Sequence, residues 1–456
     1  MVLSLAVSVV ESAPFDDAST FGSVSGWPVT KPRHAWHGGV GVAAAGTARA
    51  SAASTPSTIP RTMAVLYIPV GETALTLQTW LVDTYGMRSL QRVREVRDSL
   101  PIARGSAVRP LAEAPVDLGG VELVSRTGET ITLDQHLETS YTEGLLVLRD
   151  GAIVFERYRN GMQPDTLHLL ASVTKSLTAS VLGIALSRGQ LALDDRVGDV
   201  APDLAATCIG DATVRQIADM TAGLGFPEAY DDLSDPTADS PVLRFFRQIG
   251  TMPLLPGEAP VGVLGLLPEY PLEYPHGERF EYRTPLTCAL GHMVETAAGR
   301  PYADLLAELW AGIGAEHDAA IMLDVAGVPF AGGGMLTTLR DLARYGQVLL
   351  EDGAGVIPAD WVADTRNGSD ETRRAFDLDP ALTEADLAQW EEYRNQFWIV
   401  ESGRVFEALG LFGQVCRVNV DTRTVIVRFS AQPNDERDDV GYETYRAHAA
   451  IEAALS

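Results

Sequence analysis

Strand-like segments at both ends of a mostly helical middle are the feature that most constrains the fold of this chain. Two such runs, Leu145–Arg149 and Ala152–Tyr158, flank Asp150-Gly151, which is a strong signal for a two-residue hairpin turn. Near the other end, four more runs have strand character and an amphipathic helix closes the chain: Gln396–Glu401, Val405–Leu409, Gln414–Val420, Thr424–Ser430 and Tyr442–Leu455. We therefore predict an α/β (α+β) fold, an antiparallel sheet completed by terminal segments and flanked by terminal helices, with a mainly helical subdomain inserted at about 185–330.

The same signals divide the 456 residues into an N-terminal extension and one main domain. Residues 1–60 are rich in Ala, Ser, Thr, Gly and Pro and show little periodicity, which is typical of irregular structure. We place the partly irregular extension at 1–125 and the main domain at 126–456. Residues 226–280 contain many Pro, Asp and Glu residues and one clear helix, Val242–Ile249. A loop region of that size inside a domain usually shapes a binding site.

Composition excludes several classes of partner. The formal net charge of −26 argues against nucleic acid or a membrane surface, because both bind Lys/Arg-rich surfaces. No apolar run is long enough to span a bilayer. The cysteines (Cys208, Cys288 and Cys416) are odd in number and far apart, so they form neither a disulfide framework nor a CxxC metal pattern. We expect a cytoplasmic protein, and the sequence leaves the oligomeric state, a homodimer included, open.

Lysine is nearly absent from this chain. Of the 35 basic residues only Lys31 and Lys175 are lysines, which leaves 33 arginines. A chain that uses arginine wherever a positive charge suffices retains lysine where arginine cannot serve. Arginine stays protonated, whereas a desolvated lysine can lose its proton and act as a base. Lys31 lies in a Pro-containing segment and has no such context, so the pattern singles out Lys175.

Lys175 ends an S-x-x-K motif that starts with Ser172, at the beginning of the helix predicted over Leu169–Arg188. Residues i and i+3 of a helix share one face, so the amine and the hydroxyl become neighbours. Apolar neighbours and the positive helix N-terminus lower the pKa of a lysine below its usual value near ~10.4. A neutral Lys175 can then take the Ser172 proton as the hydroxyl attacks a carbonyl. The alternative is a lysine that merely occurs in a first helical turn, a position that is unfavourable for a cation.

The segment His168–Leu177 resembles the active-site segment of the β-lactamase/penicillin-binding-protein superfamily. Within that superfamily, the sequence is most similar to the 6-aminohexanoate-dimer (nylon-oligomer) hydrolases and related esterases. The similarity extends over roughly 130–455 and includes three further blocks in the family's order: Phe280–Thr284, Gly333–Arg344 and Gly410–Gln414. The first resembles the Y-x-N or Y-x-S motif, the second a GG…TxxDLAR helix start, and the third stands where penicillin-recognising enzymes carry K-T-G.

The resemblance implies a role for each matching residue. Ser172 is the nucleophile and Lys175 its base, and Tyr282 supplies a proton to the leaving group. The backbone N–H groups of Ser172 and Leu411 form the oxyanion hole. An aromatic pair that contacts the substrate amide and closes the site consists of Tyr230 and Trp398.

Two positions depart from the family pattern, and we count both among the substrate-binding residues. Thr284 ends the second motif in place of Asn or Ser, which alters hydrogen bonding to Lys175 or to substrate. Phe412 replaces the His or Lys of the third motif, so the site lacks the donor that anchors a β-lactam or peptide carboxylate. True β-lactamase or carboxypeptidase activity is therefore not expected. A phenyl ring at this position favours an apolar acyl group.

We predict a serine hydrolase that cleaves an amide or ester bond of a small, rather apolar substrate through an acyl-enzyme on Ser172. No metal or organic cofactor is implied. One alternative is a short-acyl carboxylesterase without amidase activity. Another is a catalytically silent binding module on the same fold. A conventional α/β-hydrolase is disfavoured, because the chain contains no G-x-S-x-G motif.

Overall fold

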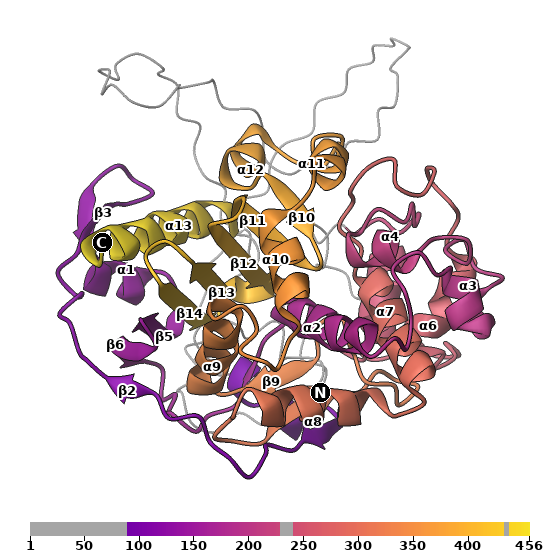
Figure 1. The fold of residues 1–456 in the computed structure, drawn as a ribbon, viewed down its shortest axis with the longest axis horizontal. Coiled ribbons are helices and arrows are strands. Elements are labelled where there is room, and N and C mark those ends of the chain that lie inside the picture. Colours follow the sequence, from indigo (N-terminus) through magenta and orange to yellow (C-terminus); the bar gives the residue numbers. More distant parts are fainter. Residues whose placement is uncertain (1–88, 229–239, 433–436) are drawn as a thin grey trace, which may run out of the picture. The chain divides into compact units, whose positions relative to one another are not determined.

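The computed structural model describes residues 89–228, 240–432 and 437–456 (Figure 1). Within them, eight strands form one sheet that is antiparallel throughout except for the parallel pair β2–β6. In the order in which they lie side by side, its strands are β10 (Glu392–Arg394), β11 (Phe397–Glu401), β12 (Val405–Gly410), β13 (Gln414–Asn419), β14 (Thr424–Ser430), β5 (Thr142–Arg149), β6 (Ala152–Tyr158) and β2 (Ala112–Glu113).

The sheet joins the two ends of the main domain, as the sequence predicts. Strand β14 pairs with β5 from Thr424 opposite Arg149 to Ser430 opposite Thr142. The predicted strands match the observed ones to within three residues at each end, and the turn at Asp150-Gly151 has the positive φ angles of a hairpin (51° and 80°). Consecutive apolar residues on the central strands β5 and β14 bury both faces of the sheet there, which fixes the register of these strands.

Two smaller sheets complete the β structure. The first consists of β1 (Ser99–Ile102), β8 (Ala319–Met322), β9 (Met335–Thr337) and β7 (His168–Leu169), and the second of β3 (Glu122–Val124) and β4 (Thr130–Thr132). Strands β1 and β2 come from the predicted extension, yet they pair with β8 and β6 of the main domain. The boundary near residue 125 and the subdomain limits of about 185–330 stay predictions.

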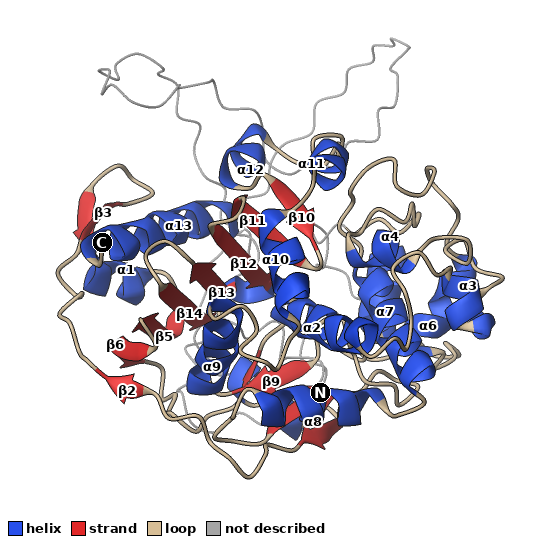
Figure 2. Ribbon diagram, in the orientation of Figure 1, coloured by secondary structure: helices blue, strands red, loops and turns tan. Residues whose placement is uncertain are grey.

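Helices flank the large sheet and fill the middle of the chain (Figure 2). They are α1 (Leu133–Thr139), α2 (Val173–Ser187), α3 (Val197–Val200), α4 (Val214–Ala218), α5 (Pro241–Gln248), α6 (Gly262–Leu266), α7 (Thr284–Ala298), α8 (Tyr302–Gly312), α9 (Leu339–Leu350), α10 (Ala359–Asn367), α11 (Asp370–Phe376), α12 (Glu384–Gln389) and α13 (Arg437–Ala454). Short 3-10 turns are η1 (Ser89–Gln91), η2 (Val93–Glu95), η3 (Pro202–Leu204), η4 (Leu267–Glu269) and η5 (Leu411–Gly413). None of the helices in the described residues is both long and apolar enough to cross a membrane.

Successive residues of β5 enter different cores. Leu145 and Val147 pack in a cluster with Ala447 and Ile451 of α13, whereas Leu146 belongs to the main core that contains α2 and α9. This alternation follows from the two-residue period of a strand. The sheet therefore forms the middle layer, and α2 lies on the face opposite α13.

Helix α2 starts four residues later than the sequence predicts. His168 and Leu169 pair with Thr337 and Leu336 as strand β7 instead of entering the helix. Ala171 then adopts a left-handed conformation with φ of 45°, which ends the strand and redirects the chain into the helix. The pairing partners lie far away in sequence, so local periodicity does not reveal this break.

Asp341 connects the start of α9 to the preceding segments. Its carboxylate accepts hydrogen bonds from Thr338 Oγ1 at 2.8 Å and from the N–H groups of Glu316 and His317 at 2.7 and 3.0 Å. It also pairs with Arg344 Nη1 at 2.7 Å, and both side chains are buried. A buried, multiply hydrogen-bonded ion pair of this kind is sensitive to the loss of one partner.

We expect Asp341→Ala to lower the free energy of unfolding by about 3 kcal/mol or more, because it leaves Arg344 buried beside unpaired backbone N–H groups. The matched control is Asp211→Ala, which removes a carboxylate from the exposed pair with Arg196 and should change stability by less than about 1 kcal/mol. Urea unfolding followed by circular dichroism measures both. Equal losses in the two variants would contradict this account of the α9 junction.

Candidate active site

The predicted nucleophile lies at a strained turn between β7 and α2. Ala171, the residue before it, has φ of 45°, a conformation that costs an L-residue roughly 1–2 kcal/mol. Hydrogen bonds hold both sides of the turn: Leu170 N donates to Met335 O at 2.8 Å, and Met335 N donates to Thr174 Oγ1 at 3.0 Å. Ser172 is half-buried and takes the N-cap position of α2 without forming the usual side-chain cap.

The Ser172 hydroxyl is instead engaged by Lys175. Lys175 Nζ donates to Ser172 Oγ at 2.8 Å and to the carbonyl oxygen of Gly332 at 2.7 Å. The lysine side chain is almost fully buried, with 1% of its surface exposed. One helical turn thus places the two side chains together, as the S-x-x-K spacing predicts.

Burial lowers the pKa of Lys175 from its ordinary value of 10.5 to about 8. An amine surrounded by protein loses the hydration that stabilises its ammonium form. The negative charge of Glu228 acts in the opposite direction and raises the pKa, as does the nearby Cys288. A substantial neutral fraction of Lys175 is therefore present at mildly alkaline pH.

Glu228 is a site residue that the sequence analysis missed. Its carboxylate is buried, with 7% exposed, and accepts hydrogen bonds from both the backbone N–H and the hydroxyl of Thr284. The Thr284 hydroxyl is thus directed to Glu228. The prediction that Thr284 contacts substrate remains a prediction. No local signal marks Glu228, because its partner lies 56 residues along the chain.

Two aromatic residues of the predicted site stack on one another beside the lysine. The ring of Tyr282 has its centroid 4.9 Å from Lys175 Nζ. The same ring stacks on Trp398 with a centroid distance of 5.7 Å and an interplanar angle of 20°. Both residues are half-buried, as Ser172 is. Both rings also pack against the main hydrophobic core, so the contact of Trp398 with substrate stays a prediction, whereas Tyr282 lies beside Lys175.

The end of β12 lies directly against the nucleophile turn. A Cβ atom added at Gly410 would lie 2.4 Å from the carbonyl oxygen of Leu170 and 3.2 Å from the N atom of Ser172. Only glycine permits this approach. The next residue is Leu411, the predicted second oxyanion donor, so the two segments predicted to form the oxyanion hole are neighbours in space.

Two predicted substrate-binding residues, Phe412 and Tyr230, have no contact with Ser172 or Lys175 described in the structure. The ring of Phe412 packs at least partly against a small cluster that includes Leu169 and Ala431, so its role in binding an acyl group stays a prediction. Tyr230 lies outside the described residues. Among the described residues, no group of three or more His, Cys, Asp or Glu side chains is arranged to hold a metal ion.

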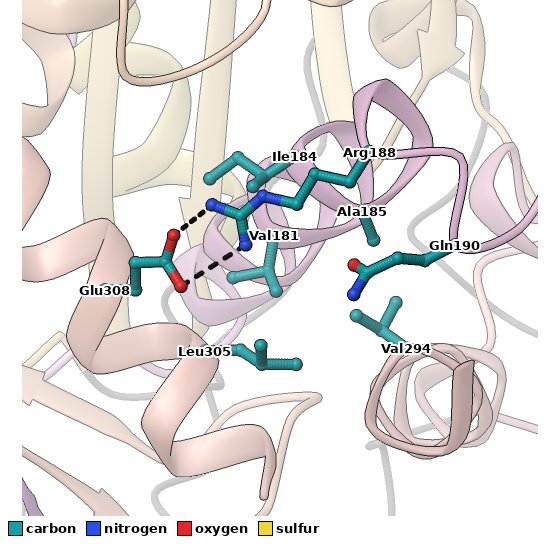
Figure 3. Close-up of a pocket in the computed structure, with 8 residues that line it drawn as sticks. All are labelled: Val181, Ile184, Ala185, Arg188, Gln190, Val294, Leu305 and Glu308. Atoms are coloured by element: carbon teal, nitrogen blue, oxygen red, sulfur yellow. Dashed lines mark hydrogen bonds and ion pairs between the residues drawn. The ribbon is translucent and has the colours of Figure 1, made fainter. Parts of the chain in front are cut away.

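A small pocket lies near the other end of α2, between α2, α7 and α8 (Figure 3). Its walls are mostly apolar, and the Arg188–Glu308 ion pair lies at its edge. Its lining residues are Val181, Ile184, Ala185, Arg188, Gln190, Val294, Leu305 and Glu308. None of these is a predicted catalytic residue, and the pocket is separate from the Ser172 site.

Comparison with known proteins identifies the family of the chain. The family model described as Beta-lactamase matches residues 134–451 of the chain. A 6-aminohexanoate-dimer hydrolase from Paenarthrobacter ureafaciens is 31% identical over 368 residues, which cover 79% of this chain and 89% of that protein.

Two solved structures share the fold. A Bacillus anthracis protein, described provisionally as a 6-aminohexanoate-dimer hydrolase, has a TM-score of 0.75 at 24% identity and covers 85% of this chain and 99% of its own. A penicillin-binding protein from Bacillus halodurans has a TM-score of 0.51 at 16% identity, with coverage of 71% and 99%. The family resemblance and the fold class predicted from the sequence are thereby confirmed.

Proposed function

Because the chain belongs to the Beta-lactamase family, we propose that it hydrolyses an amide or ester bond of a small, rather apolar substrate through a Ser172 acyl-enzyme, with Lys175 as base. The chain is a hydrolase of the β-lactamase fold that is related to 6-aminohexanoate-dimer hydrolase. The observation that carries the proposal is the 2.8 Å contact between a buried lysine amine and the hydroxyl of a half-buried serine.

The first step transfers the Ser172 proton to Lys175. Gly332 O accepts one N–H of the amine, so the lone pair of neutral Lys175 can face Ser172 Oγ. As the proton moves to Nζ, Oγ bonds to the substrate carbonyl carbon and the carbonyl oxygen becomes negative. The N–H groups of Ser172 and Leu411 stabilise that oxyanion. The neutral fraction of the base grows as pH rises through about 8, the pKa of Lys175.

The second step expels the leaving group. Tyr282 donates its phenolic proton to the departing nitrogen or oxygen while the bond to the carbonyl carbon breaks, and Lys175 returns a proton to Tyr282. A water molecule then attacks the acyl-enzyme by the same route, releasing the acid and restoring Ser172. The ring of Tyr282 beside Lys175 Nζ supports this assignment.

The substrate class follows from what surrounds these groups. Phe412 replaces the polar residue that would bind a carboxylate in penicillin-recognising relatives, and the stacked Tyr282–Trp398 pair adds aromatic surface. The activity named for the Paenarthrobacter ureafaciens relative favours a linear amide such as the 6-aminohexanoate dimer. One alternative is a short-acyl carboxylesterase without amidase activity. Another is a catalytically silent binding module on the same fold, which the substitutions at Thr284 and Phe412 favour.

We expect Ser172→Ala to reduce hydrolysis of p-nitrophenyl acetate by at least about 10³-fold, because the nucleophile is lost. Lys175→Arg should be nearly as damaging, since arginine keeps the positive charge and cannot act as the base. Steady-state kinetics measures both, with circular dichroism to verify the fold.

A fluorophosphonate probe distinguishes an active enzyme from a silent binding module. Peptide mass spectrometry should find the label on Ser172 in the wild-type protein and none on Ser172→Ala. Unlabelled wild-type protein, or full esterase activity in Ser172→Ala, would refute the assignment of Ser172.

Tyr282→Phe separates amide from ester hydrolysis. An amine leaving group must be protonated, whereas p-nitrophenolate leaves without a proton. The substitution should therefore reduce kcat for a linear amide dimer by about 100-fold or more and affect the nitrophenyl ester much less. Equal losses on the two substrates would exclude Tyr282 as the general acid, and wild-type protein without any amide turnover would favour the esterase alternative.

A further inference from the structure

The loop that carries Leu411 is Leu411–Gly413, and each of its three carbonyl groups accepts a hydrogen bond. Leu411 O accepts a hydrogen bond from Gln414 Nε2 at 3.2 Å, Phe412 O from Gln432 N at 3.1 Å, and Gly413 O from Arg428 Nη1 at 2.9 Å. The loop is a tight connection between β12 and β13 in which two successive residues have positive φ angles, 66° and 84°. The three peptide planes that follow Leu411 are therefore held in fixed orientations, and the Leu411 N–H lies in the plane immediately before them, at the end of β12.

Gln414 ties this loop to the end of β14. Its side-chain amide donates to Ser430 O at 2.7 Å and accepts from Ser430 N at 3.2 Å, in addition to its bond to Leu411 O. The side chain is buried. One amide thus bridges the loop and the neighbouring strand with three hydrogen bonds.

Arg428 fastens the loop from the side of the sheet that faces α13. Only 2% of its surface is exposed, yet its guanidinium donates to neutral oxygens: Gly413 O, the Ser140 carbonyl and Thr142 Oγ1. Among the described residues, no carboxylate forms an ion pair with it. Burial lowers its pKa to about 9. Burying a charge whose partners in the described part of the chain are all neutral is expensive, which calls for a reason to retain it here.

The fit between Arg428 and the loop is close. A Cβ atom at Gly413 would lie 2.5 Å from Arg428 Nη1, so the guanidinium occupies the space that any other residue would fill. Neither Arg428 nor Gln414 hydrogen-bonds Ser172 or Lys175. An effect of either residue on catalysis would therefore pass through the loop.

We propose that Arg428 and Gln414 are positioning residues that hold the Leu411 N–H aimed at the oxyanion. The inference rests on the proposed function. An oxyanion hole works because its dipoles are oriented before the reaction and need not reorganise during it. With these carbonyls released, the backbone on the C-terminal side of Leu411 can move, and the adjoining peptide that carries the Leu411 N–H loses its fixed direction while the substrate still binds.

The test compares Arg428→Lys and Gln414→Met with Arg417→Lys. Lysine at 428 keeps a charge and loses the fork that reaches three oxygens, and methionine at 414 preserves volume without a donor. Arg417 is a buried arginine on the adjacent strand β13 that pairs with Glu407 and Glu452 and does not touch the loop. All three variants lose buried hydrogen bonds, so their melting temperatures report the purely structural cost.

We expect Arg428→Lys and Gln414→Met to lower kcat for p-nitrophenyl acetate by roughly tenfold or more, with KM within about twofold. Inhibition by phenylboronic acid, whose Ser172 adduct places a hydroxyl in the oxyanion hole, should weaken by a similar factor. Arg417→Lys should lose thermal stability and retain both kcat and boronate affinity.

Folded loop variants with kcat within twofold of wild type would overturn the inference, as would a kcat loss with unchanged boronate affinity. If Arg428→Lys fails to fold, Gln414→Met alone decides. Ser172→Ala in the same assay distinguishes failure of this inference from failure of the proposed function. An inactive Ser172→Ala beside wild-type loop variants refutes only this inference, whereas an active Ser172→Ala refutes the proposed function and the inference with it.

Discussion

The contact between Lys175 Nζ and Ser172 Oγ is the interaction on which the site depends. It requires a helix that begins at the serine, so that one turn brings the amine back to the hydroxyl. It also requires burial, which lowers the pKa of Lys175 toward neutrality. The Gly332 carbonyl fixes the amine from the other side. Because the site is built at a strand–helix turn, Ala171 adopts a left-handed backbone conformation and Gly410 lies close to the backbone of Leu170 and Ser172.

The large sheet supplies the second half of the site from the opposite end of the chain. Strand β12 ends against the nucleophile turn, and the loop that follows is held through Gln414 and Arg428 to β14 and to the start of β5. Since β14 pairs with β5, a segment near residue 140 and one near residue 430 jointly orient the loop at 411. In the proposed mechanism, the antiparallel pairing of β14 with β5 therefore helps to orient the oxyanion hole.

Local sequence signals predict much of this arrangement. The strands near both ends, the α9 start and the Ser172–Lys175 pair follow from alternation, capping residues and helical spacing, which act over a few residues. Long-range contacts escape such signals: β7 forms because Leu169 meets Leu336, and Glu228 joins the site through Thr284. Tyr282 is brought beside Lys175 by the fold, and the family resemblance, rather than local chemistry, pointed to it.

The most direct test is a titration of Lys175 itself. In protein labelled with ¹³C-lysine, Lys31→Arg leaves one lysine, so a single ¹³Cε signal reports the amine. The account predicts a pKa near 8, and a lower one in Glu228→Gln, because removing that negative charge destabilises the ammonium form. A titration near 10.5 that does not respond to Glu228→Gln would mean that the amine stays almost fully charged even at mildly alkaline pH, and would contradict the assignment of Lys175 as the base.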